Sequence, residues 1–337
     1  MTISAKSKLT EVLDDSAMTS VPKNLFFEGM QLPISIFFRI HSCNYLTIGR
    51  KGERATFSEF SSYNDPNFLI YVRQADHALL IDYVTDLSSK LISRKNLPMS
   101  VKTKLLSSTI EDCIDNLGEK GFTSVSNLQK VSHLLMELNA STGSFEGILQ
   151  MLAELPATDS RHPMAVCMIS LILAEEMQMV HRQALEKLAL GALIHDIGLK
   201  FVPKEIVEKP RHLWTPEELS AYEQHPLKGV EMLRDMKDIS NDVLLIVAEH
   251  HETSQGTGYP KKLRDVKISP FGKIVALADC FAELLFAQTP DGKVYSVDEA
   301  IAYIDDILGQ PFNRQVFSAL KNTVNKRHLS DQKVRNG

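Results

Sequence analysis

The chain has 337 residues, of which 44% are hydrophobic and 23% are charged, and its formal net charge is −5 at pH 7. This length suits about two domains, and the composition is that of a soluble globular protein. The acidic balance argues against a nucleic-acid polymer as the main partner. We expect no membrane segment, because no apolar run reaches the roughly 18 residues that span a bilayer, and the N-terminus lacks the apolar core of a signal peptide.

The cysteines give no sign of a disulfide framework or of a thiolate zinc site. They are scattered along the chain without the paired CxxC spacing that such sites use: Cys43, Cys113, Cys167 and Cys280. A reducing compartment is the simplest environment for isolated thiols. We therefore expect a cytoplasmic protein.

The N-terminal part of the chain predicts a small α+β module. Residues 1–21 are polar and are expected to be loosely ordered. Three strand-like segments follow at 32–40, 43–49 and 67–73, and in the first of them isoleucine or phenylalanine occupies every second position. Residues 22–83 are therefore predicted to form a small α+β regulatory or adaptor module.

Helices are predicted next. Helical patterns cover residues 77–93, 100–118 and 126–141, separated by segments that carry proline or glycine. We assign residues 84–150 as a helical linker region that could carry a signal from the module to the rest of the chain. No metal-like cluster is evident in this half, and its histidines are expected to be surface or packing residues: His41, His77 and His133.

The second half predicts a mainly helical domain over residues 151–320, followed by a polar basic tail at 321–337. The helix that contains Thr215 and Glu218 begins with a capping box and a proline at the first helical position. Gly198 offers a natural end to the helix before it. Five segments have helical apolar spacing: 162–177, 183–198, 215–233, 241–251 and 271–285.

Residues that can bind metal lie on or beside each of these helices. The set comprises His162, His195, Asp196, His225, His250, His251 and Asp279. Each alone has an ordinary interpretation as a cap, surface or packing residue. Asp196 and Asp279, however, interrupt apolar stretches, where a buried carboxylate is costly unless it is paired or bound to metal. A histidine beside a carboxylate can hold one metal ion and share a second, which suggests metal-assisted hydrolysis of a phosphate ester.

An ordered series of motifs runs through the second half: HDIG, KP followed by TPEE and HP, HHE, GTGYP and ALAD. This series resembles the HD-GYP group of the HD-domain metal-dependent phosphohydrolases, over residues of about 155 to 320. The resemblance implies a helical bundle around a two- or three-metal centre that hydrolyses cyclic di-GMP. It implies one metal held by His162, His195, Asp196 and Asp279, and a neighbour held by His225, His250 and His251, with Asp196 bridging. Trinuclear members carry a glutamate where Thr158 stands, so a binuclear centre is expected.

The resemblance also implies the chemistry. Two divalent cations can lower the pKa of a bridging water enough to supply hydroxide at neutral pH, and can neutralise the phosphodiester oxygens. Nitrogen and carboxylate donors fit iron, manganese or zinc, and the resemblance favours iron or manganese. The predicted catalytic residues are Asp196 and Lys200, and the predicted substrate contacts are Tyr259, Gly258 and Lys273.

The chain departs from the family pattern around the substrate. The lysine that usually follows HDIG is Leu199, and Lys200 can replace it only if the helix has already ended. Gln255 and Ala282 stand where aspartates are usual, Lys273 replaces one arginine, and Gln288 lies near the place of another. Loss of a cation that pairs with phosphate removes a contact typically worth about 1.5 to 3 kcal/mol, so weak turnover is a serious alternative.

Three functions follow from these observations. The leading hypothesis is a cyclic di-GMP phosphodiesterase that uses metal-activated hydroxide. The second is a catalytically poor binding or signalling adaptor that retains the metal centre, with signalling proteins as partners of the N-terminal module. The third is hydrolysis of another phosphate compound by the same metals. The ligand in each case is cyclic di-GMP or a related phosphate compound.

Overall fold

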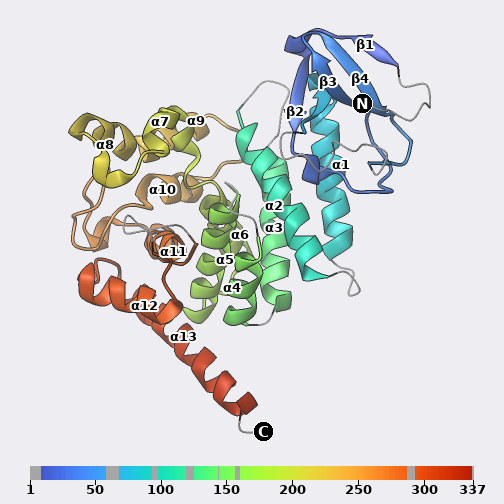
Figure 1. Ribbon diagram of the computed structural model, residues 1–337. Coiled ribbons are helices and arrows are strands. Elements are labelled where there is room, and N and C mark those ends of the chain that lie inside the picture. Colours follow the sequence, from blue (N-terminus) through green and yellow to red (C-terminus); the bar gives the residue numbers. More distant parts are fainter. Residues whose placement is uncertain are drawn as a thin grey trace. The chain divides into compact units, whose positions relative to one another are not determined.

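The computed structural model describes residues 9–57, 68–92, 98–118, 125–142, 144–155, 160–286 and 293–335. The chain divides into two compact units, Met1–Val131 and Ser132–Gly337. The first contains an antiparallel sheet with helices, and the second is helical (Figure 1). The predicted fold class, a small α+β domain followed by a mainly helical one, is confirmed. Among the described residues, no helix combines the length and the apolar character needed to cross a membrane.

The sheet of the N-terminal unit has the strand order β1-β4-β3-β5-β2, and all of its pairings are antiparallel. The three strand-like segments of the sequence each contain one strand, β3, β4 and β5. The strands are β1 (Thr10–Val12), β2 (Met18–Val21), β3 (Ile36–His41), β4 (Asn44–Gly49) and β5 (Ile70–Arg73).

The two outer strands lie in the segment that the sequence predicts to be loosely ordered, so that prediction is wrong for residues 10–21. Strand β1 pairs with β4 and β2 pairs with β5 through backbone hydrogen bonds, which need no apolar side chain. The Glu11 carboxylate also binds Arg73 at 3.0 Å and the Thr47 hydroxyl at 2.9 Å. Polar side chains therefore help to hold β1 at its edge of the sheet.

The side chains of β3 do not follow the simple alternation that the sequence suggests. Ile36 and Phe37 are both fully buried, whereas Ile40 is 51% exposed. The register with β4 shifts between Ile36 and Phe37 and again between Arg39 and His41. Because such irregularities turn side chains to the other face of a sheet, alternation in the sequence cannot predict which residues of this strand are buried.

Three long helices follow the sheet: α1 (Gln74–Ile92), α2 (Met99–Asp115) and α3 (Val125–Thr142). Helices α1 and α2 are joined by a buried pair in which His77 Nε2 lies 3.0 Å from Asp112 Oδ1. His77, expected at the surface or in packing, is thus a core residue with a polar partner. The boundary between the two units falls within α3.

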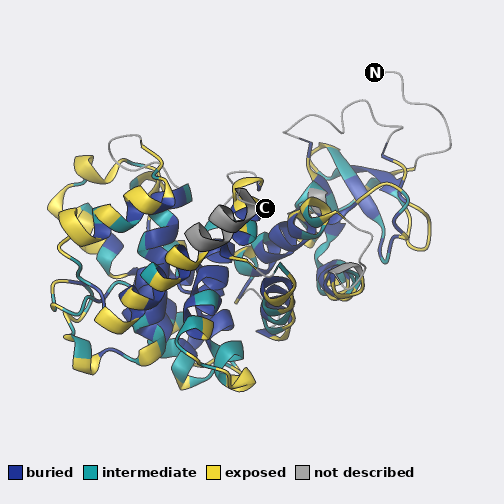
Figure 2. Ribbon diagram, turned by 90° about the horizontal axis from the view of Figure 1, so that it is seen from below, coloured by how far each residue is buried: buried dark blue, intermediate teal, exposed yellow. Residues whose placement is uncertain are grey.

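The helices of the C-terminal unit pack around α5, whose residues from Pro163 to Ala174 are buried with one exception. It contacts α6 and α11, and Figure 2 shows that buried residues gather in the interior of the helical unit. The elements are α4 (Phe145–Ala153), α5 (Arg161–Glu176), α6 (Arg182–Leu193), α7 (Lys204–Val207), α8 (Pro216–Glu223), α9 (His225–Leu233), α10 (Asn241–Glu249), α11 (Pro270–Phe286), α12 (Val297–Ala302) and α13 (Arg314–Arg335).

Several helices of the C-terminal unit begin or end at residues other than those predicted. The segment 215–233 is two helices, because α8 ends at Glu223 and α9 begins at His225, whose neighbour Pro226 cannot continue the hydrogen-bond ladder of α8. The capping box at Thr215 and Glu218 is present as predicted. Helix α13 also extends to Arg335 through the segment predicted to be a polar tail.

Helix α6 ends at Leu193, five residues before the glycine expected to stop it. Gly198 lies instead in a 3-10 turn, Ile197–Phe201, that packs backbone against backbone on α9. A methyl group built on Gly198 would lie 1.8 Å from the His225 carbonyl oxygen and 2.7 Å from Gly229 N. Only glycine allows this approach, and it places the residues before the turn beside the start of α9.

Asp15 organises the β3–β4 turn and should make it sensitive to acid. Its carboxylate accepts hydrogen bonds from the Tyr45 hydroxyl, the Cys43 amide and the Ser42 hydroxyl, and pairs with Arg39, which together lower its pKa to about 2. A depressed folded-state pKa stabilises the fold above the ordinary value of 3.8, and this stabilisation is lost as the pH falls toward 2.

We expect Asp15→Asn to speed hydrogen exchange in residues 36–49 at pH 7, and the difference from the wild-type protein to shrink as the pH approaches 2. Asp82→Asn is the control, because that carboxylate is 54% exposed and makes only a surface pair with Lys130. Equal exchange in Asp15→Asn and wild-type protein at pH 7 would contradict the assignment.

Gly198→Ala should separate the 3-10 turn from α9. The added methyl cannot be placed without moving the backbone, so we expect a loss of about 3 kcal/mol in the free energy of unfolding. Gly147→Ala is the matched control, since its methyl would approach no atom closer than 3.0 Å and no backbone atom closer than 3.8 Å, and should change stability by about 1 kcal/mol or less. Thermal unfolding compares the two, and equal stability of both variants would show that the contact is not needed.

Candidate metal centre

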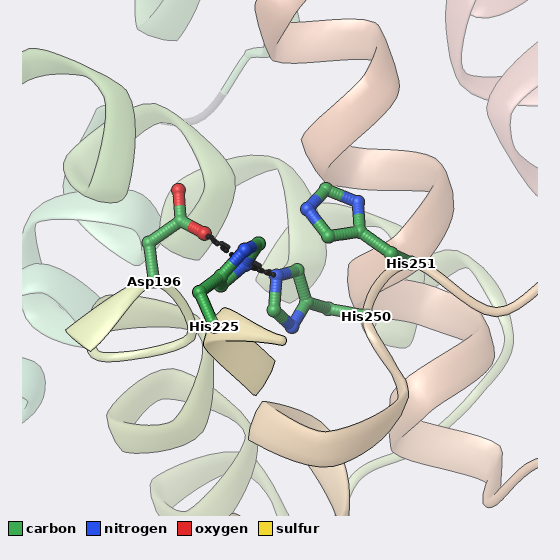
Figure 3. A group of neighbouring side chains, drawn as sticks. All are labelled: Asp196, His225, His250 and His251. Carbon is green, nitrogen blue, oxygen red and sulfur yellow. Dashed lines mark hydrogen bonds and ion pairs between the residues drawn. The ribbon is translucent and has the colours of Figure 1, made fainter. Parts of the chain in front are cut away.

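The seven predicted ligand residues converge in the C-terminal unit, from three helices and from the segments that follow two others. They form two groups, in each of which the candidate ligand atoms lie within 4.8 Å of one another. One group is His162, His195 and Asp279, and the other is Asp196, His225, His250 and His251. Figure 3 shows the second group, with the Asp196 carboxylate beside the imidazoles of His225 and His250.

The first group joins α5, the end of α6 and α11. His162 lies in the first turn of α5, as predicted, and its Nε2 is 3.0 Å from Asp279 Oδ1 on α11. His195 follows the end of α6, and its Nε2 is 3.6 Å from the same oxygen. Asp279 is only 6% exposed, so its charge is held inside the bundle by these imidazoles.

The second group joins the start of α9 to the residues after α10. His225 Nε2 and His250 Nε2 lie 3.1 Å apart, and they are 3.1 and 3.3 Å from Asp196 Oδ1. His251 reaches back to the first group, with its Nδ1 3.5 Å from Asp279 Oδ2.

Asp196 connects the two groups through its two oxygens. Oδ1 faces His225 and His250, whereas Oδ2 lies 3.2 Å from His195 Nε2 and 3.7 Å from His162 Nε2. A carboxylate placed in this way can serve one cation with each oxygen. The cluster is also open to solvent beside Asp196 and His162, whose side chains are 26% and 31% exposed, whereas His195 and His225 are fully buried.

Three of the histidines are oriented by the same local contact. The Nδ1 atoms of His195, His225 and His250 lie 2.8 to 2.9 Å from the carbonyl oxygen three residues earlier in the chain, which belongs to Ala192, Tyr222 and Val247 respectively. A carbonyl only accepts, so each Nδ1 must carry the proton. When the ring is neutral, each Nε2 therefore presents a lone pair to the cluster, as in histidines that bind metal.

These lone pairs need a cation. His225 Nε2, His250 Nε2 and Asp196 Oδ1 are mutual neighbours, and with Nδ1 protonated none of the three can donate a hydrogen bond to another. Within the described residues, His195 Nε2, Asp196 Oδ1 and His251 Nε2 are buried without a hydrogen-bond partner. A buried polar atom without a partner costs about 1–3 kcal/mol. A divalent metal would satisfy all of these acceptors, so the donor set fits one.

The electrostatics agree with this interpretation. Although burial opposes ionisation, the histidines keep the pKa of Asp196 and of Asp279 well below the ordinary value, so both remain carboxylates. Burial lowers the pKa of His250 and of His251, which keeps them neutral. Burial disfavours charge on His195 too, but Asp196 and Asp279 raise its pKa well above normal. The carboxylates thus attract positive charge to this point, as a proton or as a metal ion.

The GYP loop is held against the second group. Glu252 is buried, and its carboxylate accepts hydrogen bonds of 2.7 Å from the amides of Lys261 and Leu263. It therefore organises the loop and lies in neither ligand group. A methyl group on Gly258 would lie 2.3 Å from the His251 carbonyl oxygen, so glycine is required for the loop to approach the histidines.

Aromatic rings cover the histidines of the second group. The ring of Tyr259 lies 4.5 Å from that of His251, and the ring of Tyr222 lies 5.0 Å from that of His225. Tyr222, whose carbonyl also fixes His225, was not predicted from the sequence. The spacing of three residues before a ligand-type histidine is the signal that could have identified it.

Other predicted substrate residues lie outside the ligand groups. Helix α6 has ended before Lys200, which meets the condition set by the sequence, and Lys200 is an exposed residue of the 3-10 turn. Lys273 Nζ binds Asp265 Oδ2 at 3.2 Å, and Gln255 donates to the Gly309 carbonyl. Ala282 is fully buried on α11. Thr158 and Gln288 lie outside the described residues.

Comparisons with known proteins agree with this geometry. The HD domain family matches residues 146–316. A cyclic di-GMP phosphodiesterase of Pseudomonas aeruginosa is 32% identical over 196 residues, which are 57% of this chain and 46% of that protein. A cyclic di-GMP phosphodiesterase of Thermotoga maritima is 34% identical over 174 residues, 51% of this chain and 46% of that protein. The chain thus spans less than half the length of these two relatives.

A solved structure has a similar fold. It is an HDG"Y"P protein of Bdellovibrio bacteriovorus, with a TM-score of 0.67 and 19% sequence identity over 91% of this chain and 99% of that one. At this identity the similarity concerns the fold alone. The HD domain match covers half of the chain and includes every residue of the two ligand groups. The chain therefore belongs to the HD-domain family, and the predicted resemblance to its HD-GYP group is confirmed.

Proposed function

We propose that the C-terminal unit is a metal-dependent cyclic di-GMP phosphodiesterase of the HD-GYP type. The observation that carries the proposal is the convergence of seven ligand-type side chains in two groups that the two oxygens of Asp196 connect. Relatives that share the domain are named cyclic di-GMP phosphodiesterases, which supports the choice of substrate.

The proposed centre holds two divalent cations. One would be bound by His162, His195, Asp196 and Asp279, and the other by His225, His250 and His251, with Asp196 as the bridge. Nitrogen and carboxylate donors suit iron, manganese and zinc. We favour iron or manganese on the family resemblance.

When bound, the cations would supply Lewis-acid charge to the phosphodiester and lower the pKa of a coordinated water. The protein's part is to hold the donors still. Three imidazoles are fixed by backbone carbonyls, so their nitrogen atoms need little rearrangement to accept a cation. The exposed side of Asp196 and His162 leaves room for a phosphodiester to approach.

Residues around the centre have proposed roles in binding substrate. Tyr259 packs beside His251 and is proposed to contact the dinucleotide, on a loop whose approach depends on Gly258. Lys200 lies four residues after Asp196 in an exposed turn and is proposed to neutralise charge on the phosphate. Lys273 is the weaker candidate, because it already pairs with Asp265.

A second candidate function is a binding or signalling adaptor that keeps the metal centre but turns over poorly. It is favoured by Leu199 and Ala282, which place apolar side chains where the family usually has charged ones. In either case we propose that residues 22–83 act as a regulatory or adaptor module, with residues 84–150 as the connection to the C-terminal domain.

The direct test replaces the bridging carboxylate. Asp196→Asn removes the charge shared by the two groups, and we expect bound metal to fall and cyclic di-GMP hydrolysis to drop by about 100-fold or more. Metal analysis and a cleavage assay on the same iron- or manganese-loaded preparation measure both. Asp242→Asn is the control, since that carboxylate pairs with Lys187 outside both ligand groups.

The outcomes separate the two candidate functions. Hydrolysis by the wild-type protein that is lost in Asp196→Asn and retained in Asp242→Asn supports the phosphodiesterase. Saturable binding of cyclic di-GMP without cleavage supports the adaptor. Absence of both binding and cleavage with iron and with manganese excludes this ligand, and a screen of other cyclic dinucleotides and nucleotides then tests the third possibility.

The number of metals can be tested by removing one ligand from each group. His162→Ala and His225→Ala should each reduce the bound metal from two ions per chain toward one, because each leaves the other group and the shared Asp196 in place. Metal analysis after gel filtration measures the ratio. A wild-type value of one ion per chain would exclude the binuclear centre.

A further inference from the structure

Arg211 presents a fixed cation at the rim of the candidate metal centre. It begins a short 3-10 turn, Arg211–Leu213, that follows Pro210. Its Nη2 donates hydrogen bonds of 2.9 Å to the Tyr222 hydroxyl and to Glu283 Oε1. Its guanidinium also lies over the rings of Trp214 and Tyr222, at 5.8 and 5.1 Å. These contacts fix the orientation of the guanidinium.

The support beneath this arginine is itself rigid. The rings of Trp214 and Tyr222 lie 4.7 Å apart, and Trp214 Nε1 donates to the Lys209 carbonyl. Lys209 in turn pairs with Glu218 of the capping box at 2.7 Å. The segment before α8 thus holds Arg211 in one place. Binding a ligand would therefore cost less side-chain entropy than it would for an arginine without such contacts.

Arg211 keeps donors available to a ligand. The two hydrogen bonds use the single atom Nη2, and among the described residues Nε and Nη1 make none. The Arg211 side chain is 48% exposed. A guanidinium has five N–H donors in a planar fork that matches two phosphate oxygens. The unused donors and the exposure are the properties of a phosphate contact.

Both residues that accept hydrogen bonds from Arg211 lie next to ligand residues of the metal centre. Tyr222, which accepts from Arg211, packs its ring 5.0 Å from that of His225. Glu283, the other acceptor, lies four residues after Asp279 on α11 and therefore one helical turn away, about 5–6 Å between side chains. The negative charge of Glu283 and of Asp279 raises the pKa of Arg211 against the effect of its burial, so the guanidinium stays charged.

We infer that Arg211 binds the second phosphodiester of a cyclic dinucleotide while the first lies at the metal centre, and that Glu283 holds the guanidinium in place for it. The inference rests on the proposed function. A cyclic dinucleotide has two phosphodiester groups, and the cations can neutralise only the one at the centre. Arg211, bound to Glu283 one helical turn after Asp279 on α11, supplies the charge for the other.

The test compares two substrates that differ in the number of phosphates. Cyclic di-GMP has two, and bis(p-nitrophenyl) phosphate has one. With the metal-loaded 337-residue chain, we expect Arg211→Ala to raise KM for cyclic di-GMP by about 10- to 100-fold with a smaller change in kcat, because a charge-assisted contact is lost. The loss in kcat/KM should be at least about fivefold larger for cyclic di-GMP than for the single diester. Arg211→Lys should recover part of the loss, because it keeps the charge without the fork.

Matched variants exclude a purely structural role. Arg182→Ala removes a cation that is 76% exposed and pairs with Glu186, and it should leave KM for cyclic di-GMP unchanged. Glu283→Gln keeps an acceptor for Arg211 but removes the charge that holds it, so it should raise KM less than Arg211→Ala does. Equal losses for both substrates in Arg211→Ala, or the same rise in KM in Arg182→Ala, would overturn the inference and leave the phosphodiesterase standing.

The inference and the proposed function can fail separately. If the wild-type protein binds cyclic di-GMP without cleaving it, the ratio of Kd values between wild-type and Arg211→Ala protein gives the answer, and a ratio near one overturns the inference. A wild-type protein that neither binds nor cleaves the dinucleotide overturns both.

Discussion

The carboxylate of Asp196 lies among the nitrogen atoms of four histidines, and the rest of the site is arranged around that contact. Three of the imidazoles are held with their protons on backbone carbonyls, so their lone pairs point at one another and at the carboxylate. Such a cluster of acceptors is stable only with positive charge inside it. Its donor chemistry, nitrogen and carboxylate oxygen without thiolate, is that of a divalent transition metal.

Close contacts between backbone segments make this convergence geometrically feasible. Gly198 lets the turn after Asp196 lie directly on the start of α9, and Gly258 lets the GYP loop lie on the backbone of His251. The break between α8 and α9 places His225 at a helix start, where its ring can bind the carbonyl three residues earlier. At these places regular structure is interrupted, and a departure from local regularity at a functional site is what a folded enzyme is expected to show.

The surroundings of the centre are organised by polar contacts of their own. Glu252 fixes the loop that carries Tyr259, and Glu283, one helical turn after Asp279 on α11, pairs with Arg211. The ligand groups and this rim differ in burial: the histidines of the second group are largely enclosed, whereas Arg211 and Glu283 are about half exposed. The enclosed part suits cations, and the exposed part suits a larger anionic ligand.

Local patterns were enough to predict the helical character of the second half, the capping box at Thr215, the set of ligand-type residues and the family to which they point. These features depend on spacing and on residue type, which can be read along the chain. Long-range packing was needed to find that α6 stops at Leu193, that residues 10–21 contribute strands, and that Glu252 organises a loop. It alone placed Arg211 beside Glu283, because hydrogen bonds between residues far apart in the chain depend on packing that no local pattern encodes.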